Sequence, residues 1–239
     1  MYYSKKGRLF VTKKIKDIPL KTDEKNAYLR YLTTTDLPDI LELQTIVYEA
    51  LEDKKRLETL DESEFRTILE GEPLMVGIFH QDRLIAFRAF LNPAADEEGL
   101  GSDIGLTEEE FAEIIYSEIS NVHPNYRGNH LQTQMGRFIM NQLDTSLFRY
   151  VLATVAPGNI PSMKDKFALG MRIYKVKEKY GGKLRYVYCN DLKLKEIRAE
   201  NQTEINMNDI DGQEKLIEEG YIGVEMKKSD REWTITYQK

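Results

Sequence analysis

The sequence lacks the features that mark secreted, disulfide-stabilised or membrane-spanning proteins. It has one cysteine, Cys189, in 239 residues, which excludes an internal disulfide. Its most apolar stretch, 73–79, is far shorter than the roughly 20 residues that a membrane-spanning helix needs. Residues 1–14 are basic but contain no apolar run, so we predict no secretory signal and a cytoplasmic location.

The sequence also has no excess of positive charge and no metal-binding pattern of histidines. Lys and Arg number 34 against 40 Asp and Glu, a formal net charge of −6, which argues against general nucleic-acid binding. His80, His123 and His130 do not have the spacing of a metal site, so we predict no bound metal. The remaining composition, 41% hydrophobic and 31% charged, is that of a globular domain large enough to bury a core.

Charge is distributed unevenly along the chain. Residues 92–122 contain no Lys, Arg or His but many Asp and Glu, whereas residues 164–185 are strongly basic. This pattern predicts one surface that attracts cations and another that attracts anions, although solvated surface is the ordinary explanation for such runs.

The order of apolar patterns predicts strands and helices that alternate along the chain. Strands are expected at 27–34, 74–80, 83–91, 113–122, 149–155, 172–180 and 183–192. Helices are expected at 37–53 with Asp36 as N-cap, from Ser63 to Gly71, at about 129–143, and after 157–159. The acidic segment 93–107 and the polar segment 195–209 are predicted as loops, followed by a helix at 211–220 and a terminal hairpin.

The stretch NVHPNYRGNHLQTQMGRFI, 121–139, combines a strand end, a turn and a helix start without any acidic residue. Helices usually begin near acidic side chains, because the free N–H groups of the first turn and the macrodipole favour negative charge. A basic Arg127 and a permissive Gly128 stand there instead. This predicts a site for an external anion such as a pyrophosphate, and the alternative is an ordinary turn with a surface arginine.

Three segments in order, VHPNYRGNHLQTQM, ATVAPGNIPSMKDKFALGM and YGGKLRYVYCNDL, resemble the GNAT superfamily of acyl-CoA-dependent N-acetyltransferases. The resemblance covers about 27–192. It implies an α/β (α+β) fold with a mixed, mostly antiparallel sheet flanked by helices. Residues 1–192 would form the acetyltransferase domain, and residues 193–239 would pack on it as a helix-hairpin extension. The anion would be the pyrophosphate of acetyl-CoA.

The resemblance also implies which residues would act. Glu118 is the first candidate for the base that accepts a proton from the amine and Glu113 the second, while solvated carboxylates are the alternative for both. A backbone N–H near Asn121 or Val122, at an implied bulge, would stabilise the oxyanion. The implied coenzyme-contact residues are Asn121, Val122, His123, Arg127, Gly128, Asn129, His130, Leu131, Gln132, Asn159, Ser162 and Phe167.

The chain departs from the family pattern at three positions. Family members usually have glycine where His130 stands and glycine or alanine where Gln132 stands. They often have a tyrosine acid where this chain has Lys166, which we predict to be a surface lysine, with an electrostatic role in catalysis as the alternative. The expected function is transfer of an acetyl group from acetyl-CoA to a primary amine of an unidentified small molecule or protein. A homodimer is left open, and no nucleic-acid or membrane partner is expected. The alternative is an acyl-CoA-binding sensor or scaffold of the same fold that has lost catalysis.

Overall fold

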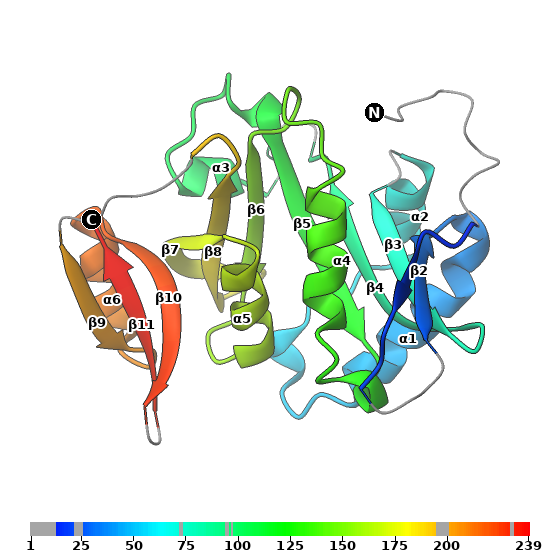
Figure 1. The fold of residues 1–239 in the computed structure, drawn as a ribbon. Coiled ribbons are helices and arrows are strands. Elements are labelled where there is room, and N and C mark those ends of the chain that lie inside the picture. The colour runs from blue at the N-terminus through cyan, green and yellow to red at the C-terminus, as the bar shows by residue number, and fades with distance from the viewer. Residues whose placement is uncertain are drawn as a thin grey trace. The chain divides into compact units, whose positions relative to one another are not determined.

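The computed structural model describes residues 13–21, 26–71, 74–93, 96, 98–194, 201–229 and 232–239 (Figure 1). They form a mixed α/β structure with mostly antiparallel strands flanked by helices, which confirms the predicted fold class. The chain divides into two compact units: Met1–Leu91 with Glu118–Gln142, and Asn92–Ser117 with Leu143–Lys239. Strand β5 (Ile114–Val122) supplies residues to both. No helix among the described residues has the length and apolarity to cross a membrane.

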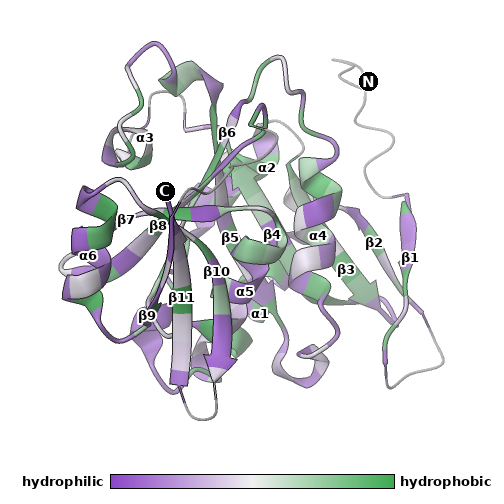
Figure 2. Ribbon diagram, turned by 60° about the vertical axis from the view of Figure 1, so that its left-hand side comes forward, coloured by the Kyte–Doolittle hydropathy of each residue, from purple (hydrophilic) through white to green (hydrophobic). Residues whose placement is uncertain are grey.

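The sheet of the first unit follows the order β1-β2-β3-β4-β5. Its first four strands are antiparallel neighbours: β1 (Lys16–Ile18), β2 (Ala27–Tyr31), β3 (Met75–His80) and β4 (Arg83–Leu91). Gln81 and Asp82 join β3 to β4 at φ values of 49° and 60°, the left-handed conformation that a tight hairpin turn requires, so the two predicted strands form a hairpin. Figure 2 shows β3 as mostly apolar and the edge strand β1 as mostly hydrophilic.

Helices cover both faces of this sheet. Helices α1 (Leu37–Glu49) and α2 (Glu62–Glu70) contact β4, and α4 (Leu131–Met140) contacts β3 and β4. Phe87 is buried in the apolar core that α1 and α2 share with β4, while the next residue, Arg88, donates a hydrogen bond to the carbonyl of Gln132 in α4. Because neighbouring strand residues point to opposite faces, α1 and α2 lie on one face and α4 on the other.

Two helix starts differ from the prediction. Asp36 precedes α1 but makes no side-chain capping bond, because its carboxylate turns back to the guanidinium of Arg30 and to Thr33. Helix α2 begins at Glu62 and not at Ser63, because Asp61 caps it through the N–H of Glu64 in a capping box. Both helices form where expected, so the errors concern only the capping residues. Helix α1 has no side-chain cap, and α2 is capped by Asp61.

The sheet of the second unit follows the order β5-β6-β8-β7-β10-β11-β9. Residues 114–116 of β5 run parallel to β6, and the later strands pair antiparallel. The strands are β6 (Tyr150–Val155), β7 (Arg172–Lys179), β8 (Lys183–Asp191), β9 (Gln202–Asn206), β10 (Ile222–Ser229) and β11 (Glu232–Gln238). The loop prediction for 195–209 is wrong at β9, because pairing with β11 stabilises a polar segment that local composition does not mark as a strand. Residues 195–200 lie outside the described part.

The helices of the second unit are α3 (Leu100–Asp103), α5 (Ile160–Ala168) and α6 (Ile210–Glu218). Helix α3 lies within the segment 93–107 that was predicted as a loop. Asp96 orders it, because this buried carboxylate accepts hydrogen bonds from the N–H groups of Gly101 and Ser102 and from the hydroxyl of Tyr116. Ala94, Ala95 and Glu97, in the same segment, lie outside the described part.

The C-terminal residues from 201 onward share this unit with β6, β7 and β8. Strand β10 pairs with β7 at Gly223 and Ile173, where a Cβ on the glycine would meet Ile173 at 3.0 Å. Gln213 of α6 is fully buried and accepts hydrogen bonds from the hydroxyls of Tyr186 on β8 and Tyr237 on β11. Close backbone approach and one buried amide therefore join the terminal strands to this sheet. The predicted domain boundary at 192 stays a prediction.

The acidic and basic segments meet within the second unit. Asp103 of α3 forms ion pairs with Lys177 and Lys179 of β7, and the ammonium of Lys179 also bonds the carbonyl of Glu98 at 2.6 Å. Asp103 offsets one of the two lysine charges, so the prediction of two separate charged surfaces is wrong for this part of the segments.

Candidate functional site

The turn between β5 and α4 has a backbone shaped by local hydrogen bonds. His123 caps the short 3₁₀ helix Pro124–Tyr126, because its Nδ1 accepts from the N–H of Asn125 at 3.2 Å. Arg127 then adopts an extended conformation, and Gly128 follows at φ 83°, where an added Cβ would meet nothing within 4 Å. This positive φ, and not lack of space, is what favours glycine at 128.

Helix α4 starts next to Arg127 with no acidic residue in its first turn. The N–H groups of Leu131 and Gln132 are in that turn, and the first N–H groups of any α-helix have no acceptor within their own helix. The macrodipole adds partial positive charge at this end, and the exposed guanidinium of Arg127 adds a full one. The arrangement predicted from the sequence is therefore present within one unit, and its electrostatics suit a phosphate group.

Asn129 holds this turn in place. Its side chain is buried; Nδ2 donates to the carbonyl of Tyr126 at 2.9 Å, and Oδ1 accepts from the N–H of Lys21 at 2.8 Å. The carbonyl of Asn129 accepts from the side chain of Gln134 at 3.1 Å. The side chain of Asn129 thus serves the loop itself, and an anion would meet backbone N–H groups here. The contact with Lys21 could not be inferred from the sequence, because the two residues are 108 positions apart.

His130 occupies the last position before α4 at φ 56° and ψ 25°, with its side chain exposed. The left-handed conformation costs a non-glycine residue about 1–2 kcal/mol, which explains physically why the GNAT pattern has glycine here. We expect His130→Gly to keep or slightly raise stability, within about 1 kcal/mol, and to bind acetyl-CoA at least as tightly as the wild type. Thermal unfolding and calorimetric titration measure the two effects. Weaker binding by the glycine variant would mean that the imidazole itself contacts the coenzyme.

Strand β5 carries the predicted catalytic positions. Glu118, Ser120 and Val122 are partly exposed, whereas Ile119 and Asn121 are buried, so the side chains alternate regularly between two faces. Ile119 belongs to the core cluster of the α1 and α2 face, which places Asn121 on that face and Glu118 on the opposite one. The N–H of His123 bonds the carbonyl of Ile85 on β4 at 2.9 Å.

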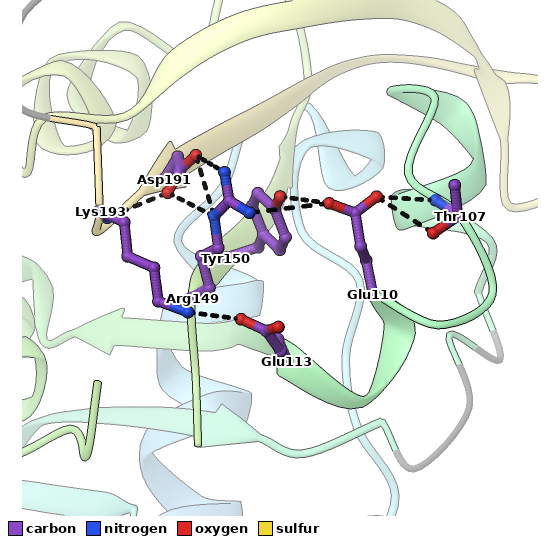
Figure 3. A network of polar contacts seen from close by, with 7 residues as sticks. All are labelled: Thr107, Glu110, Glu113, Arg149, Tyr150, Asp191 and Lys193. Atoms are coloured by element: carbon purple, nitrogen blue, oxygen red, sulfur yellow. Dashed lines mark hydrogen bonds and ion pairs between the residues drawn. The ribbon is translucent and has the colours of Figure 1, made fainter. Parts of the chain in front are cut away.

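Glu113 lies in a network of ion pairs within the second unit (Figure 3). Its carboxylate bonds the ammonium of Lys193 at 2.9 Å. Close by, Arg149 makes a two-pronged contact with Asp191, and the hydroxyl of Tyr150 donates to Glu110 at 2.6 Å. Burial, and then the hydrogen bond to Glu110, raise the pKa of the Tyr150 hydroxyl above its ordinary value. Glu113 is thus engaged in a structural cluster, which weakens it as a candidate base.

The start of α5 in the second unit holds the other predicted coenzyme contacts. Asn159 is the N-cap, with Oδ1 accepting from the N–H of Ser162 at 3.4 Å, and Phe167 packs edge-on against Tyr188 at 5.4 Å between ring centres. Lys166, predicted to be a surface residue, is buried beside Asp165 at 3.4 Å, so that prediction is wrong. The buried carboxylate next to it is the reason a lysine is tolerated there.

Two further observations concern chemistry away from this turn. Cys189 is buried in β8, and burial raises the pKa of its thiol, so it is a core residue poorly suited to act as a nucleophile. Within the described residues, no group of three or more His, Cys, Asp or Glu side chains could hold a metal ion. Sequence reasoning overlooked Arg88, which is fully buried next to the start of α4. The sequence feature that could have revealed Arg88 is a single arginine in the middle of an otherwise apolar strand.

Comparison with known proteins gives the fold. No protein-family model and no curated protein matches the sequence. Among solved structures, the ribosomal-protein-S18-alanine N-acetyltransferase of Escherichia coli is similar over 71% of this chain and 96% of its own, with a TM-score of 0.53 and 13% identity. A Salmonella typhimurium protein solved with its cofactor acetyl-CoA covers 74% of this chain and all of its own, with a TM-score of 0.54 and 13% identity.

A third structure is similar in the same way. Diaminobutyrate acetyltransferase of Paenibacillus lautus, solved with 2,4-diaminobutyric acid and coenzyme A, covers 72% of this chain and 98% of its own, with a TM-score of 0.52 and 14% identity. These likenesses show that the chain has the fold of GNAT-family acetyltransferases. The resemblance inferred from the three ordered sequence segments is therefore confirmed at the level of the fold.

Proposed function

We propose that the protein is an N-acetyltransferase that transfers an acetyl group from acetyl-CoA to a primary amine. The observation that carries this proposal is the start of α4. Arg127, a left-handed Gly128 and the first-turn N–H groups, which have no acceptor within their own helix, lie together at a helix end without acidic residues. This is where the pyrophosphate of the coenzyme would bind, and the similarity in fold to a protein solved with acetyl-CoA supports it.

The proposed reaction is direct attack of the amine on the thioester. The amine nitrogen forms a bond to the acetyl carbon, the carbon–sulfur bond breaks, and the electron pair leaves with the coenzyme thiolate. The proton lost by the amine passes through water to Glu118, and the thiolate takes up a proton from solvent. A backbone N–H of Asn121 or Val122 would stabilise the oxyanion. Asn159, with Ser162 and Phe167, is the proposed contact for the pantetheine arm in the second unit.

The second candidate is an acyl-CoA-binding protein of the same fold without catalysis. Lys166 favours it, because a lysine paired with buried Asp165 stands where the family usually has a tyrosine acid. A thiolate with a pKa near that of free cysteine, about 8.5, can nevertheless leave without such an acid. The two candidates share the coenzyme site and differ only in turnover of an amine.

Titration with acetyl-CoA tests both candidates. We expect Arg127→Glu to weaken binding by about 100-fold or more, because a charge-assisted hydrogen bond worth about 1.5–3 kcal/mol is lost and a repulsive charge is added. Isothermal titration calorimetry of the two proteins gives the measurement. Arg137→Glu is the matched control, since Arg137 is also exposed but stands in the last turn of α4. Equal weakening in both variants, or no binding by the wild type, would remove the proposal.

A further inference from the structure

Asn121, near the end of β5, has a buried side-chain amide without a hydrogen-bond partner. Seven buried side-chain atoms of the described residues have no hydrogen-bond partner, and three of them belong to the consecutive residues Ser120 and Asn121. Asn121 is 1% exposed, and both its Nδ2 and its Oδ1 are unpaired. A buried amide in this state destabilises the folded protein, so a site that keeps one has a reason other than stability.

A second buried amide in the same unit shows the usual arrangement. Gln44 of α1 is 7% exposed, and its Nε2 donates to the carbonyl of Leu60 at 2.8 Å while its Oε1 accepts from the N–H of Leu60 at 3.0 Å. Both its donor and its acceptor are satisfied by protein. The contrast between Gln44 and Asn121 indicates that the partner of Asn121 is a molecule other than this chain.

We infer that the side-chain amide of Asn121 binds the acyl group of the coenzyme. This inference rests on the proposed function, which already places the thioester next to the backbone N–H of this residue. In the bound state Nδ2 donates to the acyl carbonyl oxygen, and Oδ1 accepts an N–H of the attacking amine.

A comparison of acetyl-CoA with S-ethyl-CoA measures how much the acyl carbonyl contributes to binding. S-ethyl-CoA has the apolar bulk of the acetyl group but no carbonyl, so the ratio of its Kd to that of acetyl-CoA measures recognition of the carbonyl oxygen. We expect the wild type to prefer acetyl-CoA, and Asn121→Leu to lower this ratio about threefold or more, the loss expected for one hydrogen bond. Asn121→Ala gives the same measurement if leucine does not fit.

Thermal unfolding of the ligand-free variants provides a second measurement. Asn121→Leu should raise Tm by about 2 °C or more, because it removes two unpaired buried atoms. Gln44→Met should lower Tm and leave the Kd ratio unchanged, because it removes two satisfied hydrogen bonds away from the ligand.

These measurements distinguish failure of the inference about Asn121 from failure of the proposed acetyltransferase function. If the wild type binds neither analogue, the proposed function fails. If it binds both and the Asn121 variants keep the wild-type ratio, the acetyltransferase proposal stands and the inference about Asn121 is wrong. A lower ratio together with a higher Tm would support the inference, since a merely structural amide would lower Tm when removed.

Discussion

Glu118→Gln should lower kcat by two to four orders of magnitude while the affinity for acetyl-CoA stays within about twofold of the wild type. The amide has nearly the shape of the carboxylate but cannot accept the proton that the amine must lose, and general-base catalysis contributes about 10²–10⁴ to a rate. The measurement is the release of coenzyme thiol with a panel of primary amines, together with calorimetric titration of acetyl-CoA. Loss of turnover with retained binding would identify an enzyme and would exclude the binding-only candidate.

The remaining acidic residues provide comparisons for this experiment. Glu109→Gln removes an exposed carboxylate from the acidic segment and should leave kcat unchanged. Glu113→Gln tests the second candidate base, whose carboxylate is bonded to Lys193. A large loss of kcat in Glu113→Gln, with full activity in Glu118→Gln, would identify Glu113 and not Glu118 as the base. Full activity of both variants would mean that the amine loses its proton directly to solvent.

The candidate site shows which features a sequence can predict. The turn proposed to bind an anion was predictable because its chemistry is local: a strand end, Gly128 and an acid-free first turn are contiguous in the chain. The long-range contacts could not be predicted. Asn129 accepts a hydrogen bond from the N–H of Lys21, and Arg88 of β4 donates one to the carbonyl of Gln132 in α4. The position of His130 needed the structure as well, because a left-handed φ at a non-glycine residue leaves no mark in composition.

The errors in the fold have the same cause. Strand β9 is polar, and its pairing with β11 supplies the backbone hydrogen bonds that stabilise it. Lys166 has the sequence character of a surface residue, but it is buried with Asp165 beside it. In each case a partner distant in sequence, or a burial that only folding creates, outweighed local propensity.

Asp36→Asn should lower the free energy of unfolding by about 3–5 kcal/mol, because it leaves the buried guanidinium of Arg30 without its counter-charge. The pair is two-pronged, at 2.7 and 2.9 Å, and the two side chains are 8% and 12% exposed. The carboxylate also accepts from the N–H of Thr33 at 2.8 Å, so the substitution loosens the turn that leads into α1. Chemical denaturation at pH 7 measures the loss.

The pH dependence checks that the charge of Asp36 is responsible. Burial alone would raise the pKa of this carboxyl, but hydrogen bonds from Arg30 and Thr33 outweigh it and hold the pKa below the ordinary 3.8. A pKa lowered by folding contributes stability above its unfolded value and loses it as pH falls through the folded value. The difference between wild type and Asp36→Asn should therefore be constant above about pH 5 and shrink below about pH 4.

Two further variants distinguish charge pairing from shape. Replacing both partners, with Arg30→Met and Asp36→Leu together, should cost less than Asp36→Asn alone, because no uncompensated charge then stays buried. Arg66→Met is the exposed comparison: it breaks the 2.7 Å pair with Glu62 on α2, whose side chains are 48% and 60% exposed, and should cost under about 0.5 kcal/mol. A double variant as unstable as the single one would mean that the guanidinium contributes through its packing on Phe79, 4.0 Å from the ring centre, and not through its charge.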